Sequence, residues 1–204
     1  KPDSGTIYLK DKPIMIKSPR DAINQGIGMV HQHFMLVPIF SVVENIVLGR
    51  ETHTAGVLQF QKPSKEIEAI MQANELFADL SARVEDMPVG LQQRVEILKI
   101  LYRGAETLVF DEPTAVLTPQ EVDDLFKTFR MMKEQGKGII FISHKLDEVL
   151  AIADRITVIR RGKVIQTLER KEATKPLIAE LMVGKPVLLK VDKKPPSPGR
   201  VILE

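Results

Sequence analysis

The hydrophobic positions of this sequence fall into short apolar runs separated by longer stretches with helical spacing. Three runs, at 27–30, 108–110 and 139–142, lack a polar face, which is typical of parallel strands buried on both sides. A segment with helical spacing, 120–135, separates the last two runs. A strand, a crossover helix and a strand in that order are almost always parallel and right-handed, so the pattern predicts an α/β fold.

Local sequence signals mark the ends of several helices. The strings Ser18-Pro19-Arg20-Asp21 and Thr118-Pro119-Gln120-Glu121 each place a hydroxyl three residues before an acid, with proline at the first helical position. Gly26, Gly136 and Gly184 are expected to end helices. The other expected elements are strands at 6–9 and 14–16, helices at 41–48, from 63, after 94, at 146–153 and at 174–183, a surface loop at 51–61, and a hairpin of 156–159 with 164–168.

Polar side chains follow the buried runs directly. Asp111 and Glu112 close the run at 108–110, His144 follows the third run, and Gln32 follows the first. Open α/β sheets bind ligands at the edge where their strands end. One carboxylate there could hold magnesium through water while its neighbour orients or deprotonates the water that attacks a phosphoryl group. Alternatively, the two acids only close a strand, and the histidine and glutamine are ordinary loop residues.

A second candidate site precedes a helix in the middle of the chain. Residues 87–94 include a glycine and lead into an apolar stripe formed by Val95, Leu98, Leu101 and Tyr102. Unpaired amides and the helix dipole make such a helix start a natural anion site. The alternative is a plain helix start without a ligand.

Two strings resemble motifs of one family, the ATP-binding subunits of ABC transporters. Residues 108–114 look like its Walker B strand with the following glutamate, and 141–144 look like its switch histidine. The resemblance covers nearly the whole chain. It implies a P-loop NTPase-like fold with a parallel sheet core and an inserted helical subdomain, and it implies ATP and Mg²⁺ as cofactors.

The resemblance also implies roles for the polar residues at the sheet edge. Asp111 would be the acid on the magnesium side, and Glu112 would be the catalytic base. His144 would sense the γ-phosphate. Gln32 would begin a loop that touches magnesium and the attacking water, and this loop would also contact the membrane subunit.

The glycine-containing segment resembles the family's signature, which usually reads Leu-Ser-Gly-Gly-Gln. The resemblance therefore implies five nucleotide-binding positions: Pro88, Val89, Gly90, Leu91 and Gln92. Pro88 lacks the serine hydroxyl that would contact the γ-phosphate of ATP on a partner subunit, and Leu91 removes a further polar side chain. Two functions stay open: an ATPase that drives import, and a non-catalytic regulatory nucleotide-binding half of a tandem protein.

One expected motif is absent from the sequence. No Gly-x-x-x-x-Gly-Lys-Ser/Thr string occurs, so no loop of this type cradles the β- and γ-phosphates. By the resemblance, the chain starts just after this loop, is truncated on its N-terminal side and is inactive alone, while its intact parent hydrolyses ATP. The expected organisation is part of a RecA-like core at 1–40, a helical subdomain at 41–90, the rest of the signature helix and core at 91–184, and a linker with the start of a second ATPase domain at 185–204.

Composition narrows the possible partners. The 27 acidic and 29 basic residues give a net charge of +2, which argues against a polyanionic partner such as nucleic acid. The absence of cysteine excludes disulfides and cysteine-based zinc sites, and four scattered histidines make a poor metal cage. No apolar run approaches the roughly 18 residues of a membrane span, so any membrane role would be peripheral.

The resemblance implies a set of partners and a place in the cell. Permease subunits in the membrane would be contacted through 32–44, at the cytoplasmic face of the membrane. A second ATPase domain or subunit would complete a head-to-tail dimer, and a substrate-binding protein would act indirectly. The strings at 31–36 and 114–121 resemble the nucleoside-importing group within the simple-sugar importers, which implies import of simple sugars or nucleosides.

Overall fold

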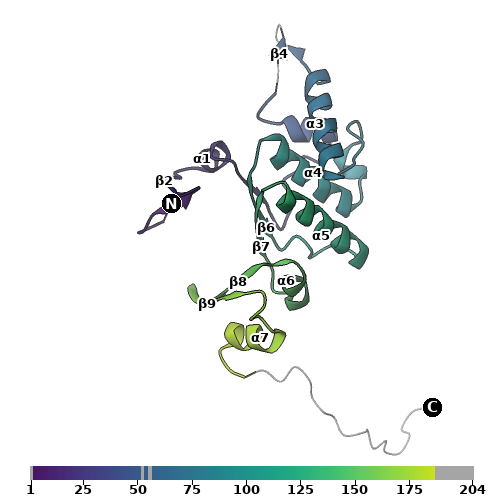
Figure 1. The fold of residues 1–204 in the computed structure, drawn as a ribbon. Coiled ribbons are helices and arrows are strands. Elements are labelled where there is room, and N and C mark those ends of the chain that lie inside the picture. Colours follow the sequence, from purple (N-terminus) through teal and green to yellow (C-terminus); the bar gives the residue numbers. More distant parts are fainter. Residues whose placement is uncertain (1, 52, 55–56, 187–204) are drawn as a thin grey trace, which may run out of the picture. The chain divides into compact units, whose positions relative to one another are not determined.

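The computed structural model describes residues 2–51, 53–54 and 57–186 (Figure 1). The described residues up to His144 form one compact unit, and those from Lys145 onward form a second. The first unit contains β1 (Ile7–Leu9), β2 (Lys12–Ile14), α1 (Pro19–Asn24), β3 (Ile27–Val30), α2 (Val42–Val47), β4 (His53–Thr54), β5 (Val57–Leu58), α3 (Gln61–Asn74), the 3₁₀ helix η1 (Val84–Asp86), α4 (Val89–Tyr102), β6 (Thr107–Asp111), α5 (Pro119–Glu134) and β7 (Gly138–Ile142). The second contains α6 (Leu146–Ile152), β8 (Arg155–Arg160), β9 (Lys163–Glu169) and α7 (Lys175–Val183).

A parallel sheet of three strands, in the order β3-β6-β7, forms the centre of the first unit. Val30 pairs with Phe110, and Phe110 pairs with Phe141 in the same register. The face of the sheet that carries these three side chains is covered by α4 and α5. Val30 and Phe110 are fully buried there. The predicted α/β fold with parallel strands is confirmed.

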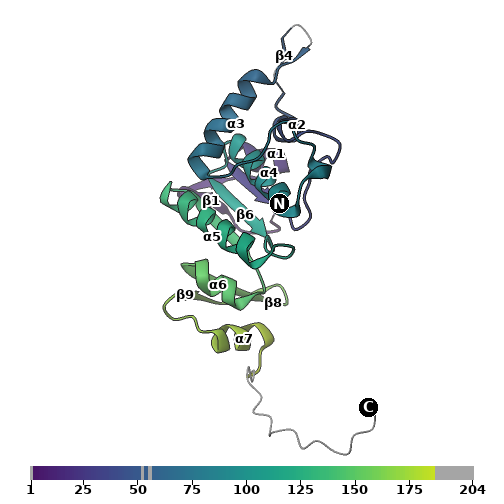
Figure 2. The same cartoon turned by 90° about the vertical axis from the view of Figure 1, so that its right-hand side faces the viewer.

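Helix α5 packs on the sheet through aromatic side chains. The helix lies beside β6 (Figures 1 and 2). The ring centroids of Phe110 and Phe129 lie 4.4 Å apart, and Phe126 meets Phe141 edge-on at 6.1 Å. Such pairs contribute about 0.5–1.5 kcal/mol beyond the area that they bury. The predicted capping box is present at Thr118, and the crossover helix expected at 120–135 is confirmed as α5.

Several predicted boundaries in the first 63 residues are wrong. Lys10 and Asp11 both have positive φ, 50° and 60°, so the hairpin turns there and β2 begins at Lys12, two residues earlier than expected. The expected loop at 51–61 contains the short β4-β5 hairpin. Helix α3 begins at Gln61, before the proline at which its start was predicted.

Helix α4 also starts earlier than the sequence suggested. Pro88 is its N-cap residue, with φ −56° and ψ 149°, and its carbonyl accepts the amides of Leu91 and Gln92 at 3.0 and 3.1 Å. The residues expected in a loop before the helix therefore form its first turns. Apolar side chains are buried around more than one side of α4, because it packs against α2, α3 and β3.

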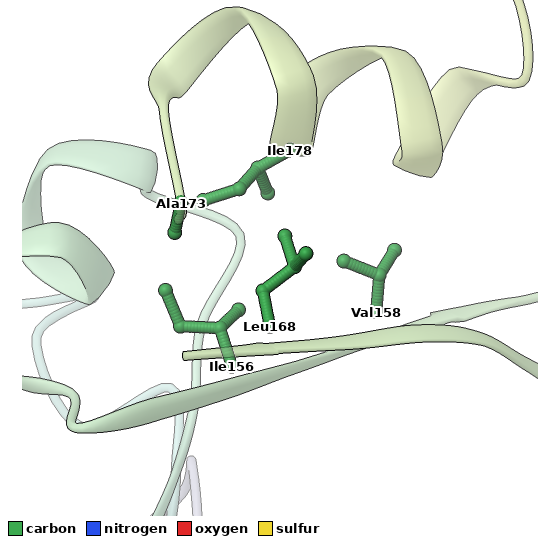
Figure 3. Packing of buried hydrophobic residues seen from close by; sticks show 5 residues of the cluster. All are labelled: Ile156, Val158, Leu168, Ala173 and Ile178. Carbon is green, nitrogen blue, oxygen red and sulfur yellow. The ribbon is translucent and has the colours of Figure 1, made fainter. Parts of the chain in front are cut away.

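The second unit has its own small core. The antiparallel pair β8-β9 is confirmed, and α7 covers one face of it (Figure 3). Thr174 caps the start of α7, and Gly184 ends it with a left-handed φ of 85°. The predicted linker and domain start at 185–204 fall almost entirely outside the described residues. The buried apolar side chains of this core are Ile156, Val158, Leu168, Ala173 and Ile178.

The capping box at the start of α2 generates a prediction on pH. The carboxylate of Glu44 accepts hydrogen bonds from the side chain and the backbone N–H of Ser41, and these bonds hold its pKa below the usual range. The ionised Glu44 carboxylate therefore stabilises the folded state at pH values above its unfolded pKa of about 4.3. This stabilisation is lost as the pH falls through the pKa of Glu44 in the folded protein. We expect Glu44→Gln to lower the free energy of unfolding at pH 7 by at most about 1 kcal/mol, because solvent screens this half-buried group.

Urea denaturation of both proteins between pH 7 and pH 3 measures this difference. The gap between them should close at acid pH, while Glu68→Gln, at an exposed position of α3 outside any capping box, should show no such gap. A gap that stays constant with pH would contradict the role of Glu44.

Candidate functional site

The parallel register brings three loops to one edge of the sheet. Because Val30, Phe110 and Phe141 lie in one row, the residues that follow β3, β6 and β7 leave the sheet together. Glu112 and Gln32 both lie two residues beyond this row. The topology inferred from the sequence is thus confirmed at this edge, while the chemical roles of its residues stay predictions.

Glu112 and His144 are in direct contact at the edge. The Oε1 atom of Glu112 lies 2.9 Å from Nδ1 of His144. Their side chains are 30% and 65% exposed, so a ligand in solvent can reach these side chains. An oriented carboxylate next to an imidazole can hold a water molecule and accept a proton from it.

The backbone at Glu112 has an unusual conformation. Its φ is +44°, in the left-handed region that residues other than glycine rarely adopt. The strain is held by hydrogen bonds on both sides: its N–H donates to the carbonyl of Ile142 at 3.0 Å, and its carbonyl accepts the amide of Ala115 at 3.2 Å. Positive φ at a non-glycine residue clusters at functional sites.

The residues suggested for magnesium fit its ordinary chemistry. Asp111 ends β6, where it pairs with Ile142, and Gln32 is exposed in the loop after β3. Within the described ranges, no group of three or more His, Asp or Glu side chains could form a metal cage. Mg²⁺ is usually bound by one or two carboxylates together with water and substrate phosphates, so a single acid with an amide oxygen suits it.

The five signature-like residues lie on a different element, the start of α4. Pro88 caps the helix without a side-chain hydrogen bond, and Val89 is 43% exposed. The side-chain Nε2 atom of Gln92 donates a hydrogen bond to the carbonyl of Met87 at 2.9 Å. The remaining two members of this set are Gly90 and Leu91 in the first helical turn.

Gly90 is required because the side chain of Glu121 approaches its backbone closely. A Cβ atom on Gly90 would come within 2.1 Å of Oε1 of Glu121. The other carboxylate oxygen of Glu121 is engaged in the capping box with Thr118, at 2.8 Å from its N–H and 2.9 Å from its hydroxyl. The start of α4 therefore rests against the first turn of α5.

Sequence reasoning missed the residues that hold the loop after Gln32. Glu96 and Lys99 of α4 are 4% and 8% exposed. Glu96 Oε1 accepts the backbone N–H of Met35 at 2.7 Å, and Lys99 Nζ donates to the carbonyl of Met35 at 2.9 Å. The two side chains thus clamp one residue of the loop from both sides.

A third buried side chain holds the same loop. Asn45 is fully buried. Its side-chain oxygen accepts the N–H of Val37 at 2.7 Å, and its side-chain nitrogen donates to the carbonyl of Val37 at 3.0 Å.

The sequence did carry a signal for the clamp formed by Glu96 and Lys99. Glu96 and Lys99 interrupt a run of apolar residues on a helix that is buried on several sides, where a charge needs a partner.

Residues 1–115 match the pattern of the family described as ABC transporter. This chain belongs to the ABC transporter family. The nucleoside import ATP-binding protein NupA of Lactococcus lactis is 50% identical over 203 residues, and the guanosine import ATP-binding protein NupO of Bacillus subtilis is 45% identical over 202. These alignments cover 100% and 99% of this chain but 40% of each relative, so the chain spans about two fifths of their length.

Solved ABC transporter cassettes share the fold. The ADP conformation of MJ1267, an ATP-binding cassette of an ABC transporter, has a TM-score of 0.74 at 24% identity, with 90% of this chain and 78% of that chain covered. The cbiO1 protein of Clostridium perfringens, part of the ABC transporter complex cbiONQ, has a TM-score of 0.67 at 28% identity, with 90% and 71% covered. The P-loop NTPase-like fold inferred from the sequence is thereby confirmed.

The buried clamp in this ABC transporter domain generates a prediction. Burial lowers the pKa of Lys99, and the nearby Glu96 opposes this effect. We expect Lys99→Met to reduce the free energy of unfolding by about 1–3 kcal/mol, because Glu96 and the Met35 carbonyl each lose a cationic partner inside the protein. Limited chymotrypsin digestion should also cleave more quickly at Phe34 or Leu36 in the released loop.

The matched control is Lys127→Met. Lys127 pairs with Asp124 at 3.1 Å, but its side chain is 69% exposed. Its removal should change the free energy of unfolding by less than about 0.5 kcal/mol. Equal urea midpoints and equal digestion rates for Lys99→Met and the unmodified protein would contradict the clamp.

Proposed function

We propose that this chain is part of an ATPase subunit that energises import of simple sugars or nucleosides, with Glu112 as its catalytic base. The observation that carries the proposal is the contact between Glu112 and His144, at 2.9 Å, on the edge of a parallel sheet in a chain of the ABC transporter family. The names of the similar NupA and NupO proteins, which state nucleoside and guanosine import, support the substrate class.

The proposed chemistry divides between neighbouring side chains. Asp111 would hold Mg²⁺, which lowers the negative charge of the phosphates, with the help of Gln32. Glu112 would orient the attacking water and accept its proton. His144 would keep the carboxylate in place and contact the γ-phosphate. These parts match the general needs of phosphoryl transfer, in which positioning and electrostatic stabilisation dominate.

The phosphate-binding loop would come from a segment of the intact protein outside this chain. Met29 is 38% exposed and Ile140 is 52% exposed, and strand alternation puts both on the sheet face opposite α4 and α5. Asp111 and Ile142, which is 47% exposed, belong to that same face. A helix following a phosphate loop would cover these side chains and bring the loop beside Asp111.

The loop at 32–44 would contact the permease subunits of the transporter. Met35 and Ile39 are 64% and 65% exposed, although the backbone around them is fixed by buried polar side chains. Exposed apolar side chains on a fixed backbone suit a protein interface. Among the described residues no helix has the length and apolar character needed to cross a membrane, and we propose a peripheral place on its cytoplasmic face.

The proposed organisation of the intact protein follows the family. Residues 1–40 and 91–184 would belong to the RecA-like core, so both compact units would contribute to it. Residues 41–90 would form the helical subdomain, and 185–204 would lead into a second ATPase domain. The residues Pro88 to Gln92 would meet ATP bound by that domain in a head-to-tail dimer, and a substrate-binding protein would deliver the cargo.

A regulatory, non-catalytic role is the second candidate. Pro88 caps α4 without a side-chain hydrogen bond, so the hydroxyl that a serine would offer to a partner's γ-phosphate is missing. Leu91 adds an apolar side chain in the same turn. Under this alternative the intact protein would bind ATP here, and turnover would depend on the other ATPase domain.

The two candidates differ in the effect of Glu112→Gln in the intact protein. As a base, Glu112 is needed for proton transfer, so the variant should bind ATP but lose about 10²- to 10⁴-fold in turnover at this site. Steady-state ATP hydrolysis and equilibrium ATP binding measure the two effects separately. Turnover equal to that of the unmodified protein would assign the base elsewhere and favour the regulatory role.

The isolated 204-residue chain should bind Mg²⁺-ATP weakly and hydrolyse none. The reason is that no phosphate loop of the Gly-Lys-Ser/Thr type occurs in it. Titration calorimetry of the chain, and of a longer form that includes the preceding segment, tests this expectation. Tight binding by the 204-residue chain alone would refute it.

A further inference from the structure

Gln93 forms a buried hydrogen bond that the roles above do not use. The side chain is 2% exposed on α4, and its Nε2 atom donates to the carbonyl of Pro113 at 2.9 Å. Pro113 directly follows Glu112 in the chain. A buried amide without a partner is unfavourable, so this bond strongly favours one relative position of α4 and the turn after β6.

Two further contacts connect the same face of α4 to the same segment. Gly90 lies three residues before Gln93 and rests against Glu121, and Arg94 forms an ion pair with Asp124 at 3.9 Å. Residues three and four apart share a helix face. The start of α4 is therefore held against the segment from Pro113 to the first turns of α5.

The conformation of Glu112 makes the position of Pro113 important. Glu112 has a φ of +44°, which a non-glycine residue keeps only when its surroundings determine it. On the N-terminal side, its amide is fixed to Ile142 at 3.0 Å. On the C-terminal side, Pro113 has no N–H, so its carbonyl is the backbone group through which this residue can be held. The Nε2 atom of Gln93 donates its hydrogen bond to that carbonyl.

We propose that Gln93 is a positioning residue that keeps the Glu112 carboxylate in its working orientation. In this role Gln93 acts through the Pro113 carbonyl and not as a catalytic group. The inference rests on the proposed function, in which Glu112 is the base. Small displacements of a catalytic group have large effects on rate, since an error of about 1 Å costs up to about 100-fold.

The test uses Gln93→Met in the intact protein that contains this chain. Methionine has a similar length and volume but lacks the amide donor. We expect kcat for ATP hydrolysis to fall about tenfold, with KM for ATP and equilibrium ATP binding unchanged within about twofold, because Glu112 is displaced while the groups that bind ATP stay in place.

The matched control is Gln135→Met. Gln135 also donates its Nε2 atom to a backbone carbonyl of another element, that of Ala73 at 2.9 Å, but this bond lies at the far end of α5. Its removal should leave kcat unchanged. If Gln93→Met does not fold, as judged by circular dichroism and ATP binding, Gln93→Leu removes the same donor with a smaller side chain and carries the same expectation.

A double-mutant cycle with Glu112→Gln distinguishes positioning from a general structural role. If Gln93 acts through Glu112, Gln93→Met should cause no further loss of kcat in the Glu112→Gln protein. A further loss of about tenfold in the double mutant, multiplying the loss caused by Glu112→Gln alone, would overturn the proposal. An inactive Glu112→Gln together with a normal kcat for Gln93→Met would overturn this inference alone, while an active Glu112→Gln would overturn the proposed base and the inference with it.

Discussion

Parallel pairing of β3, β6 and β7 is the constraint on which the candidate site depends. Hydrogen bonds fix the register of each strand against the next, so residues that follow the strands leave the sheet at set positions beside one another. Glu112 and His144 meet at 2.9 Å because β6 and β7 end together. A slip of one residue would exchange the faces of the sheet, exposing Phe110 and burying Asp111, which makes any other register unfavourable.

The sequence predicted this edge well because its signals are local. Apolar runs without a polar face identify the strands of a parallel sheet, and the crossover rule then orders them without knowledge of any tertiary contact. The expected burial on both sides is wrong for the described residues, because Met29, Ile140 and Ile142 are exposed on one face. The capping boxes at Ser18 and Thr118 were equally readable, since all their atoms lie within four residues. Where local signals compete, prediction failed: α4 begins at Val89, six residues before the apolar stripe that starts at Val95, because the carbonyl of Pro88 accepts the first amides of the helix.

The clamps around α4 could not be predicted from the sequence, because their partners are distant. Glu96 and Lys99 bond to Met35 across 61 and 64 residues, and Gln93 bonds to Pro113 across 20. A charge within an apolar helix shows that a partner must exist, but it does not say which backbone group will meet it. The sequence alone indicates that these buried side chains need hydrogen-bond partners, and only the tertiary structure shows which backbone groups those partners are.

These polar bonds determine how α4 is oriented. Apolar packing is non-directional, so a helix that is apolar on several sides could rotate or slide with little loss of buried area. The bonds from Gln93 to Pro113 and from Lys99 to Met35 exclude such movements, because each would leave buried polar groups unpaired. Six residues separate Gln93 and Lys99, or about 9 Å along a rigid helix. The loop that begins at Gln32 and the turn at Glu112 are therefore held in a fixed relation by one helix, and a shift of either loop relative to the other must break at least one of these buried bonds.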